Sequence, residues 1–184
     1  MKKTIWIVIA VVVLVAIFLI SSYNGLVTSR AQVEESFANI DAQLQRRADL
    51  IPNLVETVKG ITEQEKTIVD AVTSARENYL SASDENEKIE ASNQLSTALS
   101  NLLVVVENYP EITSGQNFIA LQDELAGTEN RIAQARKSYN ETVKEYNTSI
   151  KKFPRNIFAG IFGFESMNYF ETADENKTAP KVEF

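Results

Sequence analysis

The 184 residues include no cysteine and no histidine, and these two absences exclude much of ordinary enzyme chemistry. A chain without them lacks the most common general base, the most common metal ligands and the thiol nucleophile. The six glycines are scattered, so there is no glycine-rich loop of the kind that binds phosphate. We therefore expect no metal, no other cofactor and no enzymatic activity.

Basic residues are also scarce, because 18 Lys and Arg stand against 25 Asp and Glu. Two of the 18, Lys2 and Lys3, lie at the extreme N-terminus, so residues 23–184 alone carry a net charge of −9. This sign argues against binding to nucleic acid and against electrostatic adhesion to anionic lipid. The lack of cysteine also excludes a lipoprotein anchor.

One long apolar run stands out from this polar background. No charged or strongly polar side chain occurs between Ile5 and Ile20, and flanking Thr and Ser residues bring the run close to the ~20 residues that span a bilayer. We predict that residues 1–22 form a transmembrane anchor.

A cleaved signal peptide is the alternative to a retained anchor. Its best cleavage sites would be Leu19-Ile20-Ser21 and Ile20-Ser21-Ser22, and each begins with a bulky residue where a small one is required. Retention is therefore favoured. Because Lys2 and Lys3 precede the run and the next cation is Arg30, the positive-inside rule places the N-terminus in the cytoplasm and the remaining chain outside it.

Beyond the anchor, apolar residues recur at helical spacing in three stretches, and no stretch alternates as a strand would. Residues 26–79 fill both seam positions of a seven-residue repeat, as in a coiled coil. The second stretch covers residues 89–106 and the third covers residues 118–150. Three charged residues fall on the seam of the first stretch: Arg30, Arg47 and Glu65. The pattern predicts an all-α domain.

Pro52 lies inside the first stretch and either ends a helix or bends one. Asp49 is suited to be an N-cap, which would place Pro52 in the first turn of a new helix, where its missing N–H costs little. A break there also yields four helices of matched length. We predict a transmembrane helix followed by an antiparallel four-helix bundle in residues 23–152. The alternative is a long kinked first helix in a three-helix, oligomeric stalk.

Residues 153–170 hold five Phe and one Tyr, a composition typical of an interfacial membrane anchor. Four helices would return this segment to the membrane, whereas three would carry it to the far tip. The predicted membrane-interface residues are Phe153, Phe158, Phe162 and Phe164. The alternative is that these rings close the open end of the bundle. Residues 171–184 are polar and acidic and are predicted to be disordered.

Charged residues gather around Pro52 and in the third helical stretch. The candidate interaction residues are Arg46, Arg47, Asp49, Glu124, Glu129 and Arg131. Because an unpaired buried guanidinium is costly, we expect a Glu or Asp from a neighbouring helix to pair with Arg47 on the seam. Such a pair would fix the register of the bundle. A docking or ligand surface is the alternative interpretation.

Several strings of this sequence resemble the bacterial LemA family. They are Tyr23-Asn24-x-Leu26-Val27, residues 40–55 with Arg46-Arg47-x-Asp49-Leu50-Ile51-Pro52-Asn53-Leu54-Val55, Lys59-Gly60, Tyr109-Pro110, residues 124–136, and the pairs Tyr139-Asn140 and Tyr146-Asn147. The resemblance implies an N-terminally anchored helical protein of the bacterial cytoplasmic (inner) membrane. It also implies that some relatives accompany membrane zinc proteases of the HtpX type and that one branch serves magnetosome formation. It supplies no catalytic residue.

Taken together, the anchor, the apolar heptads and the lack of catalytic groups predict a single-pass, oligomeric scaffold or adaptor of the bacterial cell envelope. Its expected partners are membrane lipid, further copies of the chain and, as the resemblance implies, a membrane zinc protease of the HtpX type. Nucleic acid is not an expected partner. A membrane-shaping or lipid-interacting structural protein is the second hypothesis, and an enzyme using a carboxylate or a Ser-Lys pair is the third.

Overall fold

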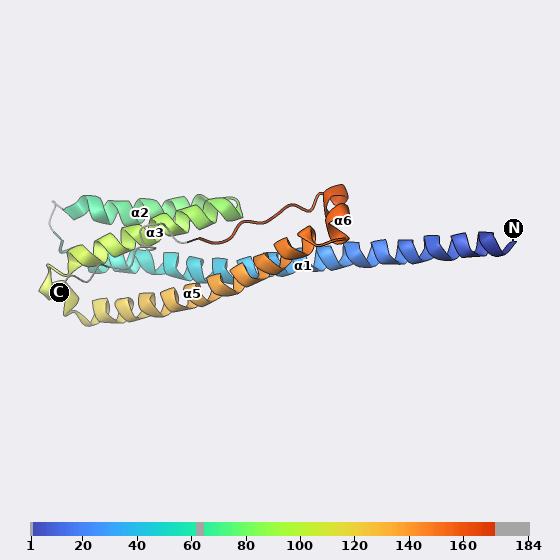
Figure 1. Ribbon diagram of the computed structural model, residues 1–184. Helices are drawn as coiled ribbons and strands as arrows, with labels where there is room; N and C mark the ends of the chain where they lie inside the picture. Colours follow the sequence, from blue (N-terminus) through green and yellow to red (C-terminus); the bar gives the residue numbers. More distant parts are fainter. Residues whose placement is uncertain (1, 62–64, 172–184) are drawn as a thin grey trace, which may run out of the picture. The chain divides into compact units, whose positions relative to one another are not determined.

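The computed structural model describes residues 2–61 and 65–171, and the regular structure within these residues is entirely helical (Figure 1). The helices are α1 (Lys2–Thr57), α2 (Lys66–Ser81), α3 (Glu85–Val106), α4 (Pro110–Thr113), α5 (Gln116–Lys151) and α6 (Arg155–Phe162). The all-α prediction is confirmed. The tail predicted to be disordered lies, from residue 172 onwards, outside the described residues.

The predicted helix break at Pro52 is wrong, because α1 continues through Pro52 to Thr57. A proline in a helix interior cannot donate to the carbonyl four residues earlier, which here is that of Ala48. The Nε of Arg76 in α2 donates to this carbonyl at 2.8 Å and so replaces the missing backbone donor. The helix needs no cap at Asp49 because its one lost hydrogen bond is made by a side chain.

The chain divides into two compact units, and both α1 and α5 contribute to each of them. Within the described residues, unit 1 consists of residues 2–37 and 138–169, and unit 2 consists of residues 38–137 and 170–171. The alternative prediction had a long first helix, as observed. That alternative also counted three helices, whereas four long helices, α1, α2, α3 and α5, contribute to the core of unit 2.

Unit 2 is held by an apolar core to which α1, α2, α3 and α5 all contribute. Its buried members are Ile51, Leu54, Val58, Val72, Ala75, Leu95, Leu99, Leu102, Val106, Ile112, Phe118 and Leu125. Those from α1 and α2 are seam positions of the seven-residue repeat, which explains why one face of each helix is apolar. Asp84 caps α3 by accepting from the Glu87 backbone N–H at 2.9 Å, and this fixes where the α2–α3 connection ends.

Unit 1 contains the first 37 residues of the chain together with the C-terminal part of α5 and all of α6. Among the described residues, α1 is the one helix long and apolar enough to cross a membrane, judged by length and composition. Apart from the half-buried Leu19, every residue from Ile5 to Ile20 is exposed. Gly163, with φ of 72°, ends α6 in the left-handed conformation that favours glycine.

We predict that Arg76 stabilises the fold only as long as Pro52 is present. Arg76→Leu leaves the Ala48 carbonyl without its donor and should lower the free energy of unfolding by about 1 to 3 kcal/mol. In a Pro52→Ala background the backbone N–H returns, so the same substitution should cost at least about 1 kcal/mol less. Urea unfolding of the four proteins in mild detergent measures this coupling.

The exposed Arg131→Leu substitution serves as the matched control and should change stability by less than about 0.5 kcal/mol in either background. Equal costs of Arg76→Leu with and without Pro52 would show that the two residues act independently.

Candidate functional site

Arg47 is the centre of the polar cluster in unit 2, and its side chain is only 3% exposed. Its Nη1 donates to Glu129 Oε2 and to Ser96 Oγ, both at 2.9 Å, and its Nη2 donates to the Ser92 carbonyl at 3.1 Å. Since these partners lie on α3 and α5, one α1 side chain joins three helices. The carboxylate expected from a neighbouring helix is that of Glu129.

Glu129 is the main charge that compensates two guanidinium groups. Burial lowers the pKa of Arg47, while the negative charge of Glu129 opposes this shift and the nearby Arg136 reinforces it. Burial also lowers the pKa of Arg136, again opposed by Glu129. Among the described residues, the Nε atoms of both arginines are buried without a hydrogen-bond partner. The cluster therefore depends strongly on a single carboxylate.

Three of the other candidate interaction residues, Arg46, Glu124 and Arg131, form a separate group on the surface. Arg46 pairs with Glu124, and Arg131 lies 4.0 Å from the same carboxylate. Because these side chains are between about a third and a half exposed, water screens the pairs strongly and each is worth at most about 1 kcal/mol. Asp49 belongs to neither group and accepts a hydrogen bond from Gln45 at 2.9 Å. The six candidates thus do not make one site.

A groove of about 370 Å³ opens beside the buried arginine. Its lining residues are Arg47, Ser96, Leu99, Ser100, Leu103, Gln122, Leu125, Ala126 and Glu129. The cation and the carboxylate in this groove already pair with each other, and the remaining lining is leucine with two hydroxyl groups and an amide. In the described part of the chain, no three carboxylates gather as a metal site would require. This geometry fits a structural ion pair.

A second polar contact in unit 2 involves Tyr79, a buried seam residue. Its hydroxyl donates to Asp41 Oδ1 at 2.7 Å, and Lys88 Nζ donates to Asp41 Oδ2 at 2.6 Å. Burial and the hydrogen bond to the Asp41 carboxylate raise the pKa of Tyr79 well above its usual value. A tyrosine on a seam signals such a contact, since its hydroxyl needs a partner when buried. Nothing in the sequence around Lys88 indicated its contact with Asp41.

The predicted membrane-interface residues lie in unit 1, where three of them meet the start of the chain. Phe158 packs edge-on against Phe18, with ring centroids 6.0 Å apart. Phe162 and Phe164 contact Tyr23 at 5.0 and 5.9 Å. Phe153 makes no such ring contact among the described residues and is 80% exposed. The rings therefore gather where the apolar run of α1 ends.

Residues 164–169 follow α6 as an extended stretch (Figure 1). Side chains of α5 hold this stretch through its backbone. The hydroxyl of Tyr146 donates to the Glu165 carbonyl and that of Tyr139 to the Asn168 carbonyl, both at 3.0 Å. Asn147 forms a two-way pair with Met167, donating to its carbonyl at 2.8 Å and accepting from its N–H at 2.9 Å. The signal for this contact was the repeat of Tyr-Asn after seven residues, on one face of a helix. Its partner could not be inferred from the sequence.

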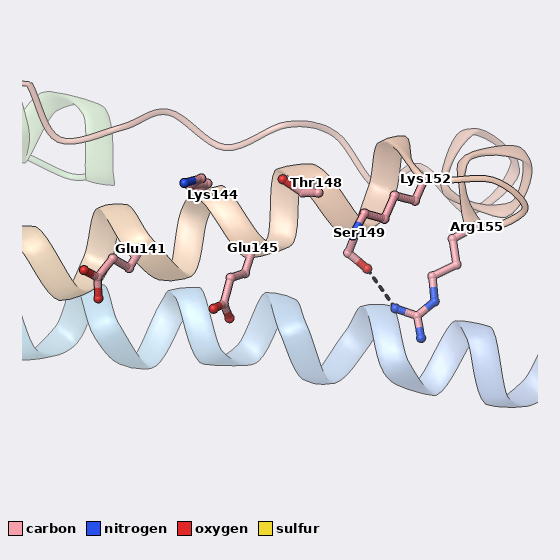
Figure 2. A pocket seen from close by; sticks show the side chains of 7 residues that line it. All are labelled: Glu141, Lys144, Glu145, Thr148, Ser149, Lys152 and Arg155. Atoms are coloured by element: carbon pink, nitrogen blue, oxygen red, sulfur yellow. Dashed lines mark hydrogen bonds between the residues drawn. The ribbon is translucent and has the colours of Figure 1, made fainter.

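A cleft along α5 in unit 1 is lined mostly by charged side chains (Figure 2). It is lined by Glu141, Lys144, Glu145, Thr148, Ser149, Lys152 and Arg155. Arg155 reaches back from α6 and its Nη1 donates to Ser149 Oγ at 2.9 Å (Figure 2). No sequence pattern had brought these residues together.

The model of the LemA family matches residues 36–184, which is most of the chain. The chain belongs to the LemA family. The strings at residues 40–55 and 124–136 that resembled this family lie within the match, whereas the apolar run of this LemA chain precedes it.

Curated relatives of the LemA chain include magnetosome proteins of two bacteria. Magnetosome proteins MamQ 1 and MamQ 2 of Paramagnetospirillum magneticum are each 28% identical over 179 residues, covering 83% of this chain and 66% of the relative. Magnetosome protein MamQ of Magnetospirillum gryphiswaldense is 26% identical over 178 residues, covering 83% and 65%. The chain thus spans just under two thirds of the length of these relatives.

We predict that removing Glu129 destabilises this LemA chain more than removing Arg47. Glu129→Ala leaves a buried guanidinium without its carboxylate and should cost about 3 kcal/mol or more. Arg47→Met fills the same volume, and the carboxylate it leaves behind is 52% exposed and regains water, so its cost should stay below about 1.5 kcal/mol. Urea unfolding in mild detergent provides both values.

Glu124→Ala is the control for this pair of substitutions, because it removes a carboxylate from an exposed cluster on the same helix. It should cost at most about 1 kcal/mol. A cost for Glu129→Ala that equals this control would show that Arg47 is not held by the pair.

Proposed function

We propose that this LemA-family chain is a single-pass, membrane-anchored structural protein of the bacterial cell envelope. On this proposal it assembles with copies of itself, its helices form an antiparallel bundle outside the cytoplasm, and it serves as a scaffold or adaptor for other membrane proteins. The relatives named for the magnetosome support a membrane-associated structural role over an enzymatic one, since their names refer to a cell structure and to no reaction.

The observation that carries the proposal is the exposed apolar run of α1. Side chains such as Trp6 at 71% exposure and Leu14 at 66% have no cover within the described protein. Such a continuous apolar surface is not stable in water. Transfer of the run into a bilayer is favoured by about 4 to 8 kcal/mol on an insertion scale. The same helix, α1, also contributes residues to unit 2.

A membrane-shaping role is the second candidate, and α6 is the observation that favours it. This short helix leaves Ile157, Ile161 and Phe162 at least half exposed, and Phe153 precedes it. An exposed apolar helix beside an anchor is suited to lie in the interface and to displace lipid there. Deformation of liposomes by the purified protein would favour this role over a scaffold.

We predict that the bundle faces away from the cytoplasm. The two lysines before the apolar run and the absence of a cation between it and Arg30 favour this orientation. Protease added to intact spheroplasts should therefore digest the protein beyond residue 22, while a cytoplasmic control protein survives. Digestion only in inverted vesicles would reverse the assignment.

We predict that the full-length protein forms an assembly of several subunits. An anchored bundle without catalytic groups can act only by contact, and several anchors together give such contacts avidity. Light scattering in mild detergent and in nanodiscs should give a mass of several subunits. A monomer in both media would contradict the scaffold role. Crosslinking in native membranes, followed by mass spectrometry, would show whether a zinc protease of the HtpX type is among the partners.

A further inference from the structure

Three cations lie at one end of unit 1, in a part of the chain that carries no acid. Residues 146–164 contain Lys151, Lys152 and Arg155 and not a single Asp or Glu. All three side chains are exposed. Among the described residues, none of them lies within 4 Å of a carboxylate oxygen. Their charge is therefore available to an external anion.

The contacts of Arg155 fix its level relative to the apolar run of α1. A Cβ added to Gly25 would lie 3.4 Å from Nη2 of Arg155 and 3.8 Å from Cζ of Arg155. The guanidinium of Arg155 therefore lies against α1 at Gly25. Gly25 is five residues beyond Ile20, which is about 7 Å along the axis. The headgroup layer on each side of the hydrocarbon is about 5 to 7 Å thick. An anchored α1 therefore places this guanidinium at the level of the lipid phosphates.

The aromatic contacts of the same unit agree with this level. Phe158 meets Phe18, which lies inside the apolar run, and Phe162 meets Tyr23, which lies just beyond it. Rings at these two positions belong to the boundary of the hydrocarbon and the interface. The cations of the adjoining helix ends then face the headgroups.

Along the cleft, cations lie at the end nearer the anchor and carboxylates lie further from it. Lys152 and Arg155 lie at the end where Arg155 donates to Ser149, while Glu145 and Glu141 lie one and two turns of α5 further away (Figure 2). Lys144 is the cation on the distant side. An anion at the anchor end therefore meets two cations and a hydroxyl before it meets a carboxylate.

We propose that Lys152, Arg155 and Ser149 bind the phosphate of a membrane phospholipid, with Lys151 adding to the local charge. The planar guanidinium can hold two phosphate oxygens while the lysine acts as a point charge. The inference rests on the proposed membrane anchoring and adds to it a preference for anionic over zwitterionic lipids. Each cation near an anionic surface contributes about a fivefold gain in binding.

The net charge of −9 beyond the anchor had argued against electrostatic attraction to anionic lipid. That argument averages over the whole exported domain, whereas a lipid headgroup meets only the charges within about 8 Å, the screening distance at physiological salt. Residues 146–164, where the three cations lie, contain no Asp or Glu. Local charge therefore decides the sign of the interaction.

The test uses the full-length protein extracted from vesicles of phosphatidylcholine and phosphatidylglycerol, with retained lipids counted by native mass spectrometry. The wild type should retain phosphatidylglycerol preferentially. The double substitution Lys152→Gln and Arg155→Gln should reduce this preference at least tenfold. The charge-conserving double variant Lys152→Arg and Arg155→Lys should keep most of the wild-type preference.

The matched control is Lys137→Gln with Lys144→Gln, which removes the same charge from positions within α5, at least seven residues before Lys151. Its lipid preference should stay within twofold of the wild type. Equal losses in the two double variants would overturn the proposal, because net charge would then explain the effect. So would a wild type without any preference.

Flotation with neutral vesicles separates this test from that of the anchor. All variants should float, because the apolar run is unchanged. If the wild type itself fails to float, the proposed anchoring is wrong. If every variant floats and the preference does not change, the headgroup site alone is wrong.

Discussion

The hydrogen bond from Arg76 to the Ala48 carbonyl is the contact on which the continuity of α1 depends. Pro52 removes one backbone donor from this helix, and an arginine of α2 supplies a donor in its place. Because the helix continues, the seam residues Ile51 and Leu54 on either side of Pro52 both lie in the core of unit 2. The apolar run, the buried Arg47 and part of the core of unit 2 lie on this one helix. A contact between α1 and α2 thus compensates for the one hydrogen bond that Pro52 removes.

The sequence was sufficient for the helical class and for most of the core, because seven-residue spacing fixes which face of a helix is apolar. It was also sufficient to mark Arg47 as a buried cation, since a charged residue on a seam needs a partner. It was not sufficient for the course of the chain at Pro52. The donor that permits the helix to continue is 24 residues beyond Pro52, and nothing in local propensity indicates it. The pairing of Glu129 with Arg47 likewise depends on tertiary packing.

The charges of unit 1 show how a fold can reverse the meaning of a composition. Sequence rules for membrane topology count cations close to the ends of an apolar run, and long domains cross the membrane largely regardless of charge. Lys151, Lys152 and Arg155 are more than 130 residues beyond that run, so such rules pass over them. In the folded chain Arg155 lies against Gly25, five residues beyond the end of that run. A chain can therefore satisfy the positive-inside rule during insertion and still carry a basic surface on the opposite side.

Four hydrogen bonds join side chains of α5 to the backbone of residues 165–168. The contacts require the side chains of Tyr139, Tyr146 and Asn147. On the other side they require only backbone groups, which almost any residue at positions 165, 167 and 168 supplies. The two partners of this contact are therefore under unequal evolutionary constraint. Tyr139, Tyr146 and Asn147 should therefore vary less between distant relatives than the residues at positions 165, 167 and 168. Comparison of related sequences should therefore reveal such a contact in only one of the two segments that form it.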